Sequence, residues 1–278
     1  MLAGVVSVEQ LLAPGPTRVM GILNVTPDSF AEVTAREARQ AIDWGIELAE
    51  QGADVVDVGG VSTRPGASPV DCDEEMARVL PVVEALAGAG IAVSVDTVRA
   101  LVARAAVGAG AVFVNDVSGG LADPEILSVV AGSSAGFVLQ HWRVPFDHSL
   151  THADVVAEVR AELSHRAGLA LEAGIPPTRL VVDPGIGFGK SPTQNWTLLA
   201  SADAIATLGF PVLWGVSRKR FLSQMYSRPT DPWERDVASV AATALLAAKG
   251  VWAVRTHTVE DHLTAIRVAE AVRGGGRS

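Results

Sequence analysis

The sequence has a single cysteine, few lysines and no long apolar run. Cys72 stands alone among the 278 residues, which excludes an intrachain disulfide and a cysteine-based zinc site. No stretch of about 18 or more apolar residues occurs, so no membrane span is predicted. The first residues also lack the basic and apolar regions of a signal peptide. These absences predict a cytoplasmic protein.

Positive charge is also scarce. The formal net charge is −9, and only three of the 22 basic residues are lysines: Lys190, Lys219 and Lys249. A nucleic-acid or anionic-membrane partner needs a basic face, so both partners are excluded. A small basic pocket within an acidic surface remains compatible with this charge.

Hydrophobic residues make up 49% of the chain, and they form eight short apolar runs separated by stretches with helical periodicity. The runs occupy residues 19–23, 54–58, 91–95, 111–114, 136–139, 180–182, 211–214 and 251–254. Continuous apolar runs are typical of parallel strands covered on both faces. Eight such units in a row predict an α/β fold, a single (β/α)₈ TIM barrel. A doubly wound open sheet is the alternative, but no glycine-rich turn follows the first run.

The same patterning predicts boundaries and surfaces. We expect residues 1–18 to form an N-terminal cap, 19–272 the barrel and 273–278 a disordered tail. Apolar spacing predicts one buried helical face through Val98, Leu101, Val102 and Ala105. Glycines such as Gly52, Gly108 and Gly250 are expected in helix C-cap positions. Arginines within helices, among them Arg78 and Arg166, are interpreted as solvated.

Polar residues end all eight apolar runs. Since barrel active sites lie at the carboxyl ends of the strands, one pocket can collect these side chains. The polar residues at or just after the run ends include Asn24, Asp96, Asn115, Asp116, Gln140, His141, Asp183, Ser217, Lys219, Arg255 and His257. A helix cap or turn residue is the alternative for any single aspartate, most of all Asp116.

A subset of these residues fits a phosphate or diphosphate group. Arg64, Arg255 and His257 lie in loops that follow apolar runs, and arginine is suited to bidentate phosphate contacts. Asn24 adds an oxygen ligand for Mg²⁺, which keeps its waters and binds substrate phosphates. A packed core histidine is the alternative for His257.

Several motifs are specific enough to indicate a family. Residues 24–30 (Asn-Val-Thr-Pro-Asp-Ser-Phe) and 57–66 (Asp-Val-Gly-Gly-Val-Ser-Thr-Arg-Pro-Gly) resemble the first two signatures of the dihydropteroate synthases. Later motifs at 94–97, 115–119, 183–190, 217–219 and 255–257 are similar too, and they follow in the family's order.

This resemblance implies a TIM barrel, a homodimer and a reaction. The family joins 6-hydroxymethyl-7,8-dihydropterin diphosphate to p-aminobenzoate and releases diphosphate. By match, the pterin would be bound by Asp96, Asn115, Asp183 and Lys219. Gln140 and Gly215 are expected to be further substrate-binding residues. The diphosphate would be held by Asn24 with Mg²⁺ and by Arg255 and His257. The phosphate and p-aminobenzoate end would be formed by Thr63 and Arg64, with Phe188, Lys190 and Ser217 nearby. Catalysis would rest on Asn24, Asp96, Asp183, Lys219, Arg255 and His257.

The chain departs from the family pattern in four places. Residues 31–34 stand where the family usually has Ser-Asp-Gly-Gly, and Val61 stands where it usually has glutamate. Gln140 replaces a usual apolar residue, and Thr258 replaces a usual aspartate. Because of these changes, an inactive paralogue that binds pterin without catalysis is an alternative interpretation. A methyltetrahydrofolate–corrinoid methyltransferase domain is a further alternative, against which the predicted diphosphate site argues.

Overall fold

The computed structural model describes residues 6–25, 35–61, 70–142 and 154–275. Its core is an eight-stranded parallel sheet in the order β6-β5-β4-β3-β2-β1-β8-β7. The strands are β1 (Arg18–Asn24), β2 (Val55–Gly59), β3 (Val93–Asp96), β4 (Phe113–Asp116), β5 (Gly136–Gln140), β6 (Leu180–Asp183), β7 (Leu213–Trp214) and β8 (Ala253–Thr256). A parallel bridge from Val182 to Val212, just before β7, brings the two edges together. The predicted TIM barrel is thereby confirmed.

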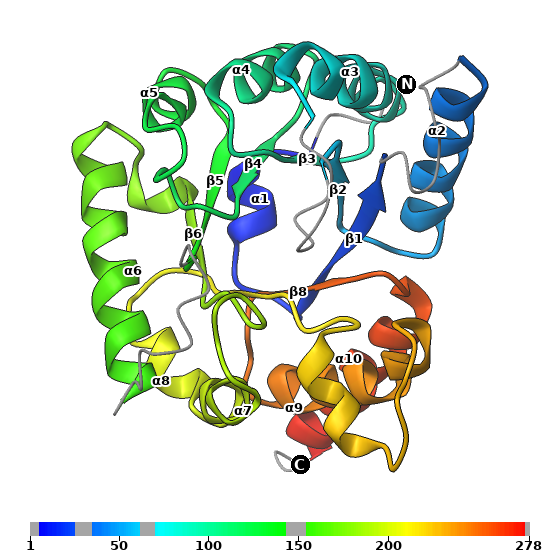
Figure 1. Ribbon diagram of the computed structural model, residues 1–278, viewed down its shortest axis with the longest axis vertical. Coiled ribbons are helices and arrows are strands. Elements are labelled where there is room, and N and C mark those ends of the chain that lie inside the picture. Colours follow the sequence, from blue (N-terminus) through cyan, green and yellow to red (C-terminus); the bar gives the residue numbers. More distant parts are fainter. Residues whose placement is uncertain (1–5, 26–34, 62–69, 143–153, 276–278) are drawn as a thin grey trace.

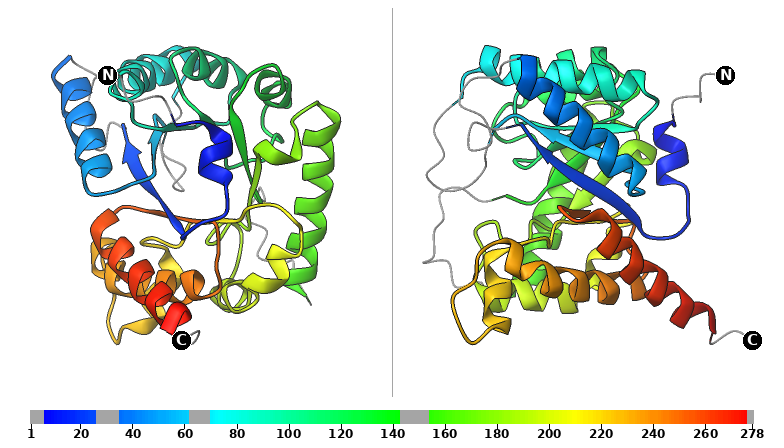
Figure 2. Two further views of the ribbon diagram at one scale, coloured as in Figure 1. Left: turned by 180° about the vertical axis from the view of Figure 1, so that it is seen from behind. Right: turned by 90° about the vertical axis from the view of Figure 1, so that its right-hand side faces the viewer.

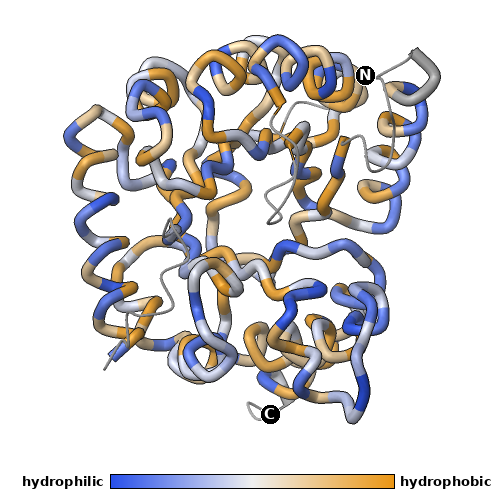
Figure 3. Tube along the Cα trace, in the orientation of Figure 1, coloured by the Kyte–Doolittle hydropathy of each residue, from blue (hydrophilic) through white to orange (hydrophobic). Residues whose placement is uncertain are grey.

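Helices surround the barrel (Figure 1). They are α2 (Ala35–Glu50), α3 (Cys72–Gly88), α4 (Ala100–Gly108), α5 (Glu125–Ala131), α6 (Val155–Glu172), α7 (Pro192–Ala200), α8 (Ala202–Ala206), α9 (Asp236–Ala248) and α10 (Val259–Gly275). A short helix, α1 (Val8–Leu12), lies at one end of the barrel (Figure 2). Along the surrounding helices, hydrophobic and hydrophilic residues alternate (Figure 3), as expected of elements with one face against a sheet.

Each strand alternates between the barrel interior and the helices, because successive strand side chains point to opposite faces. One interior residue from each strand, or in the case of β3 the residue directly before it, joins a common apolar layer. The layer consists of Met20, Val55, Ala92, Phe113, Val138, Val181, Leu213 and Ala253. Val8 and Leu11 of α1 pack against it. The layer therefore forms an apolar floor, and positions two residues further along each strand face the mouth above it.

Two local predictions were wrong. Leu101 was expected on the buried face of α4, but it is 64% exposed while Val102 and Ala103 are buried. Gly108 was expected in the C-cap position of α4, but it is the last helical residue; the C-cap is Ala109, and the left-handed turn falls at Gly110, whose φ is +110°. The apolar composition of α4 gives its sequence two acceptable faces, and packing against the barrel selects one.

The arginine prediction also needs correction. Arg78 and Arg166 are buried rather than solvated. Arg78 donates from Nη1 to the carbonyl of Gly60 at 2.8 Å and pairs with Glu74. At the carboxyl end of the chain, α10 continues through Gly275, so the tail predicted from residue 273 begins with helical residues.

The described residues contain no helix long and apolar enough to cross a membrane.

Candidate active site

The polar residues of the barrel mouth occupy the interior strand positions directly above the apolar floor. Asp57, Asn115, Gln140, Asp183 and Arg255 each follow a floor residue of their own strand by two positions. The alternation of the strands therefore turns all five side chains inward. Four of them were predicted from the sequence. Asp57 was missed because it lies inside an apolar run. Its position two residues after Val55, on the same face of the strand, is the pattern that indicates it.

Arg255 organises one side of the mouth. It donates from Nε to Asp57 Oδ2 at 2.6 Å and from Nη2 to Asp96 Oδ2 at 2.7 Å. Asn115 donates from Nδ2 to the same Asp57 oxygen at 2.9 Å. Strands β2, β3, β4 and β8 are thus linked through side chains as well as through the sheet.

Burial dominates the electrostatics of this cluster. Desolvation raises the pKa of Asp96 to about 7, although Arg255 opposes the shift. The negative charge of Asp57 raises the same pKa further. The pKa of Arg255 is raised despite its burial, because Asp57 and Asp96 both stabilise the guanidinium cation. Arg255 therefore remains charged throughout the physiological range.

Asp183 and Lys219 form a second charged centre. Burial raises the pKa of Asp183 to about 6, against a hydrogen bond of 2.7 Å that its Oδ1 accepts from the Gly185 amide. Burial lowers the pKa of Lys219 to about 8, although the charge of Asp183 stabilises the ammonium group. Lys219 Nζ also lies 4.1 Å from the centroid of the Phe188 ring, a cation–π contact.

Gly187 leaves room for this pair, and Gly215 is in ordinary contact with it. A Cβ on Gly187, whose φ is +82°, would lie 2.9 Å from Lys219 Cδ. A Cβ on Gly215 would lie 3.7 Å from Asp183 Oδ2. Gly187 therefore serves both a left-handed turn and the close approach of the lysine chain.

Lys190 stabilises the loop after β6. Its Nζ donates to the carbonyls of Gly185 and Phe188 at 2.8 and 3.1 Å and lies 2.9 Å from His141 Nδ1. Burial lowers the pKa of His141 to about 4, so the ring is neutral and Nδ1 accepts from the lysine. The other ring nitrogen, Nε2, lies 3.0 Å from Glu162 Oε2. His141 is thus a neutral link between the loops after β5 and β6.

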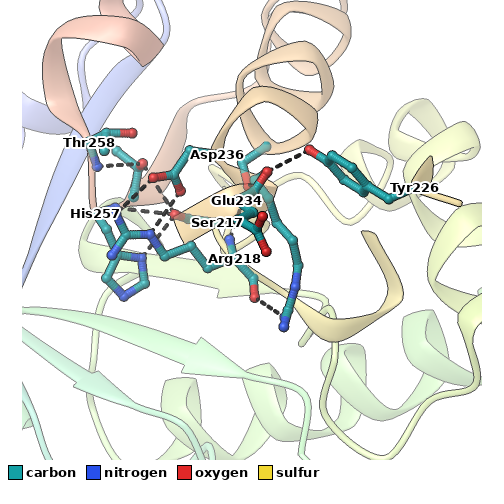
Figure 4. Close-up of polar contacts among 10 residues, drawn as sticks. Ser217, Arg218, Tyr226, Glu234, Asp236, His257 and Thr258 are labelled. Carbon is teal, nitrogen blue, oxygen red and sulfur yellow. Dashed lines mark hydrogen bonds and ion pairs between the residues drawn. The ribbon is translucent and has the colours of Figure 1, made fainter. Parts of the chain in front are cut away.

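Ser217 and His257 meet at the ends of β7 and β8 (Figure 4). Ser217 Oγ lies 2.9 Å from His257 Nδ1 and accepts from the His257 amide at 3.3 Å. Between Ser217 and Lys219, Arg218 adopts a left-handed conformation with φ +59°. The Arg218 guanidinium donates from Nε and Nη2 to the two oxygens of Asp236, each at 2.8 Å. This pairing fixes a strained turn that separates Ser217 from Lys219.

Two further residues support the mouth without lying in it. Asp116 accepts from the amides of Ser118 and Gly120 at 2.7 Å each, so the turn alternative holds for this aspartate. Arg166 donates to the carbonyls of Ser118, Gln140 and Trp142, at 3.2, 3.1 and 2.9 Å. A buried arginine on α6 therefore ties together the loops that follow β4 and β5, a role that the sequence pattern did not indicate.

Asn24 lies at the open rim of the barrel. A Cβ on Gly59 would come within 3.8 Å of Asn24 Oδ1 and 3.7 Å of Asp96 Oδ2. Both atoms are oxygen donors, the ligand type that Mg²⁺ prefers. Among the described residues, no three histidine, cysteine or carboxylate side chains are grouped to hold a metal by themselves.

Part of the predicted site lies outside the described residues, namely Thr63, Arg64 and the altered segment 31–34. All other predicted site residues lie at the carboxyl ends of the strands or in the loops that follow them. A closed parallel barrel with buried carboxylates, a buried lysine and a paired arginine at this end defines a TIM-barrel enzyme that binds a polar small molecule in its mouth.

Comparisons with known proteins identify which enzyme family this is. The family model described as pterin binding enzyme matches residues 20–257. The chain is 44% identical to the dihydropteroate synthase of Mycobacterium leprae (strain TN), covering 92% of this chain and 93% of the relative. A Xanthomonas albilineans dihydropteroate synthase solved with 4-aminobenzoic acid superposes with a TM-score of 0.85 at 43% identity, covering 93% of each chain. The Xanthomonas albilineans enzyme in complex with 7,8-dihydropteroate superposes with a TM-score of 0.84 at 42% identity. The match covers 94% of this chain and 95% of that chain.

The chain belongs to the dihydropteroate synthase family, whose members are transferases of the folate pathway. The family, fold and activity predicted from the motifs are thereby confirmed.

Proposed function

We propose that this barrel mouth binds 6-hydroxymethyl-7,8-dihydropterin diphosphate and p-aminobenzoate and joins them with release of diphosphate. The observation that carries the proposal is the buried pair Asp183 and Lys219 above an apolar floor. An ionised carboxylate accepts two parallel hydrogen bonds from the ring N–H and 2-amino group of a pterin. Lys219 donates to a ring acceptor, and Asp96 and Asn115 complete the polar lining.

The diphosphate end of the substrate would be held at the rim. Arg255 remains cationic, and His257 lies beside it at the end of β8. Two nitrogens of Arg255 face Asp57 and Asp96, so its contribution to the diphosphate is a fixed positive charge with Nη1 as the remaining donor group. Mg²⁺, held by Asn24 together with substrate oxygens, would neutralise part of the diphosphate charge.

The residues suit a dissociative reaction. When the bond between the pterin methylene carbon and the diphosphate oxygen breaks, negative charge grows at the rim and positive charge spreads into the pterin. Arg255 and His257 stabilise the negative charge of the departing diphosphate. The carboxylates of Asp96 and Asp183 stabilise the positive charge in the pterin. The aryl amine of p-aminobenzoate then forms the new carbon–nitrogen bond and loses a proton. Charge stabilisation and positioning thus do the work, and no general-base pair is required.

The p-aminobenzoate would enter beside the loop after β6. Phe188 offers a ring and Ser217 a hydroxyl group there, while Lys190 holds the loop by its carbonyl contacts. Thr63 and Arg64 are assigned to this end by motif alone.

A homodimer is part of the proposal. Val237 and Leu245 on α9, and Val268 and Val272 on α10, are between 57% and 77% exposed. These neighbouring helices therefore present an apolar surface of the kind that subunit contacts bury.

The test is diphosphate release by the purified protein with pterin diphosphate, p-aminobenzoate and Mg²⁺. We expect release to require both organic substrates. Arg255→Ala should lower turnover by at least ~10²-fold, the typical cost of losing a contact to developing charge.

The matched control is Arg39→Ala, because Arg39 is an exposed helix residue that pairs with Asp43 in the same helix. Arg255→Lys, which keeps the charge, guards against loss of fold in the alanine variant. Release without p-aminobenzoate, or near-native turnover in Arg255→Ala, would contradict the assignment. Failure of well-folded wild type to rescue a strain lacking the synthase would favour an inactive pterin binder.

A further inference from the structure

Gln140 carries a buried hydrogen-bond donor that none of the described residues satisfies. It is the last residue of β5 and only 6% exposed. Its Nε2 atom is buried and has no hydrogen-bond partner among the described residues. A buried donor left unpaired is destabilising, so such a group calls for an explanation.

The position of Gln140 places this donor in the mouth. Val138, two residues earlier, belongs to the apolar floor, whereas Phe137 and Leu139 pack on the helix side. Gln140 is therefore an interior position. It pairs in register with Asp183 on β6, which the proposed function assigns to the pterin.

The backbone at Gln140 is held firmly. Its carbonyl accepts from Arg166 Nη1 at 3.1 Å, and the next amide, of His141, donates to the Asp183 carbonyl at 2.8 Å. A donor mounted on a strand whose backbone is held in this way starts from a fixed position, so binding has to order only the buried side chain.

We propose that Gln140 is a specificity-determining residue whose Nε2 donates to an acceptor atom, a ring nitrogen or carbonyl oxygen, of the pterin heterocycle. Asp183 accepts from the N–H edge of the same ring, so neighbouring strands present one donor and one acceptor to it. Such a pair discriminates against flat aromatic rings that lack this pattern, since those rings leave buried groups unpaired. The inference rests on the proposed function and adds a recognition contact to it.

Gln140→Met keeps the side-chain length and removes the donor. We expect it to change the pterin affinity and the thermal stability of the protein in different directions. In the free protein this variant relieves an unpaired group, so its melting temperature should equal or exceed that of the wild type. Its affinity for unphosphorylated 6-hydroxymethylpterin, measured by titration calorimetry, should fall about 5- to 10-fold, the value of one hydrogen bond.

Steady-state kinetics give a second readout. Because the contact exists both before and during the reaction, the KM for pterin diphosphate should rise while kcat and the KM for p-aminobenzoate stay within about twofold. Gln140→Glu should bind pterin more weakly than Gln140→Met, because it replaces the donor by a second carboxylate beside Asp183. The control is Gln51→Met, an exchange of the same chemistry at a residue whose Nε2 donates to Glu47 on the helix surface.

The outcomes separate the two proposals. If the wild type binds no pterin, the proposed function fails. If the wild type binds pterin and Gln140→Met binds it within twofold as well, the proposed function stands and the role of Gln140 is refuted. A large fall in melting temperature for Gln140→Met with unchanged affinity would likewise refute it, because it would assign the side chain to folding alone.

Discussion

Asp183→Asn should separate function from stability at this site. Asp183 is 3% exposed, and burial raises the pKa of its carboxyl group from 3.8 to about 6. One pKa unit corresponds to about 1.4 kcal/mol, so ionised Asp183 costs the free protein about 3 kcal/mol. Asparagine has the same shape, keeps an oxygen for the Gly185 amide and carries no charge.

The sign of the effect follows from the direction of the shift. Since the folded pKa lies above the unfolded value, the stability associated with protonated Asp183 is complete below about pH 4 and lost as pH rises through about 6. The variant avoids that loss. It also removes the counter-charge of Lys219, whose pKa of about 8 would fall further and leave a neutral amine near neutral pH.

We therefore expect the free Asp183→Asn protein to be more stable than the wild type at pH 8, by up to about 3 kcal/mol, and equally stable near pH 4. Urea unfolding at both pH values measures this difference. In the same variant, pterin affinity should fall at least ~10²-fold, because an amide cannot accept both hydrogen bonds from the ring.

Asp203→Asn is the control, since Asp203 is 73% exposed and pairs with Lys249 outside the mouth. Equal destabilisation at both pH values would refute the electrostatic reasoning, and pterin affinity within threefold of the wild type would refute the assignment of Asp183.

Two further predictions concern Asp183 and the residues around it. Binding of unphosphorylated pterin, followed by calorimetry, should strengthen as pH rises through about 6, where Asp183 ionises, and weaken above about 8, where Lys219 loses its proton; a flat profile from pH 5 to 9 would contradict it. Gly185→Ala should destabilise the fold by more than ~2 kcal/mol in thermal unfolding, because φ is +67° and a Cβ would lie 1.9 Å from the His141 carbonyl oxygen; a melting temperature within one degree of the wild type would count against it.

Periodicity predicted the barrel because each strand must be apolar on both faces. The strand-end residues of the mouth were predicted for the same geometric reason, since parallel strands place their carboxyl ends together. Asp57 was not predicted as a site residue because it lies inside an apolar run. Only the structure shows its partners, Asn115 and Arg255.

The errors share a physical cause. A helix sequence shows which residues are polar but not whether a carbonyl from another segment lies within reach. Arg166 is buried because the carbonyls of Ser118, Gln140 and Trp142 converge on it, and these come from two separate loops. Leu101 is exposed because neighbouring small residues of α4 pack closer to the barrel. Both outcomes depend on tertiary placement, which local pattern does not encode.

The apolar floor connects the chemistry of the mouth to its energetics. Burial of the mouth above it raises the pKa values of Asp96 and Asp183 and lowers that of Lys219. The same burial leaves Asp57 Oδ1 and Gln140 Nε2 unpaired among the described residues. Each of these costs is borne by the free protein and relieved by a ligand of complementary polarity. Part of the binding free energy for the pterin is thus stored in the folded barrel, and variants that remove a buried polar group should gain stability as they lose affinity.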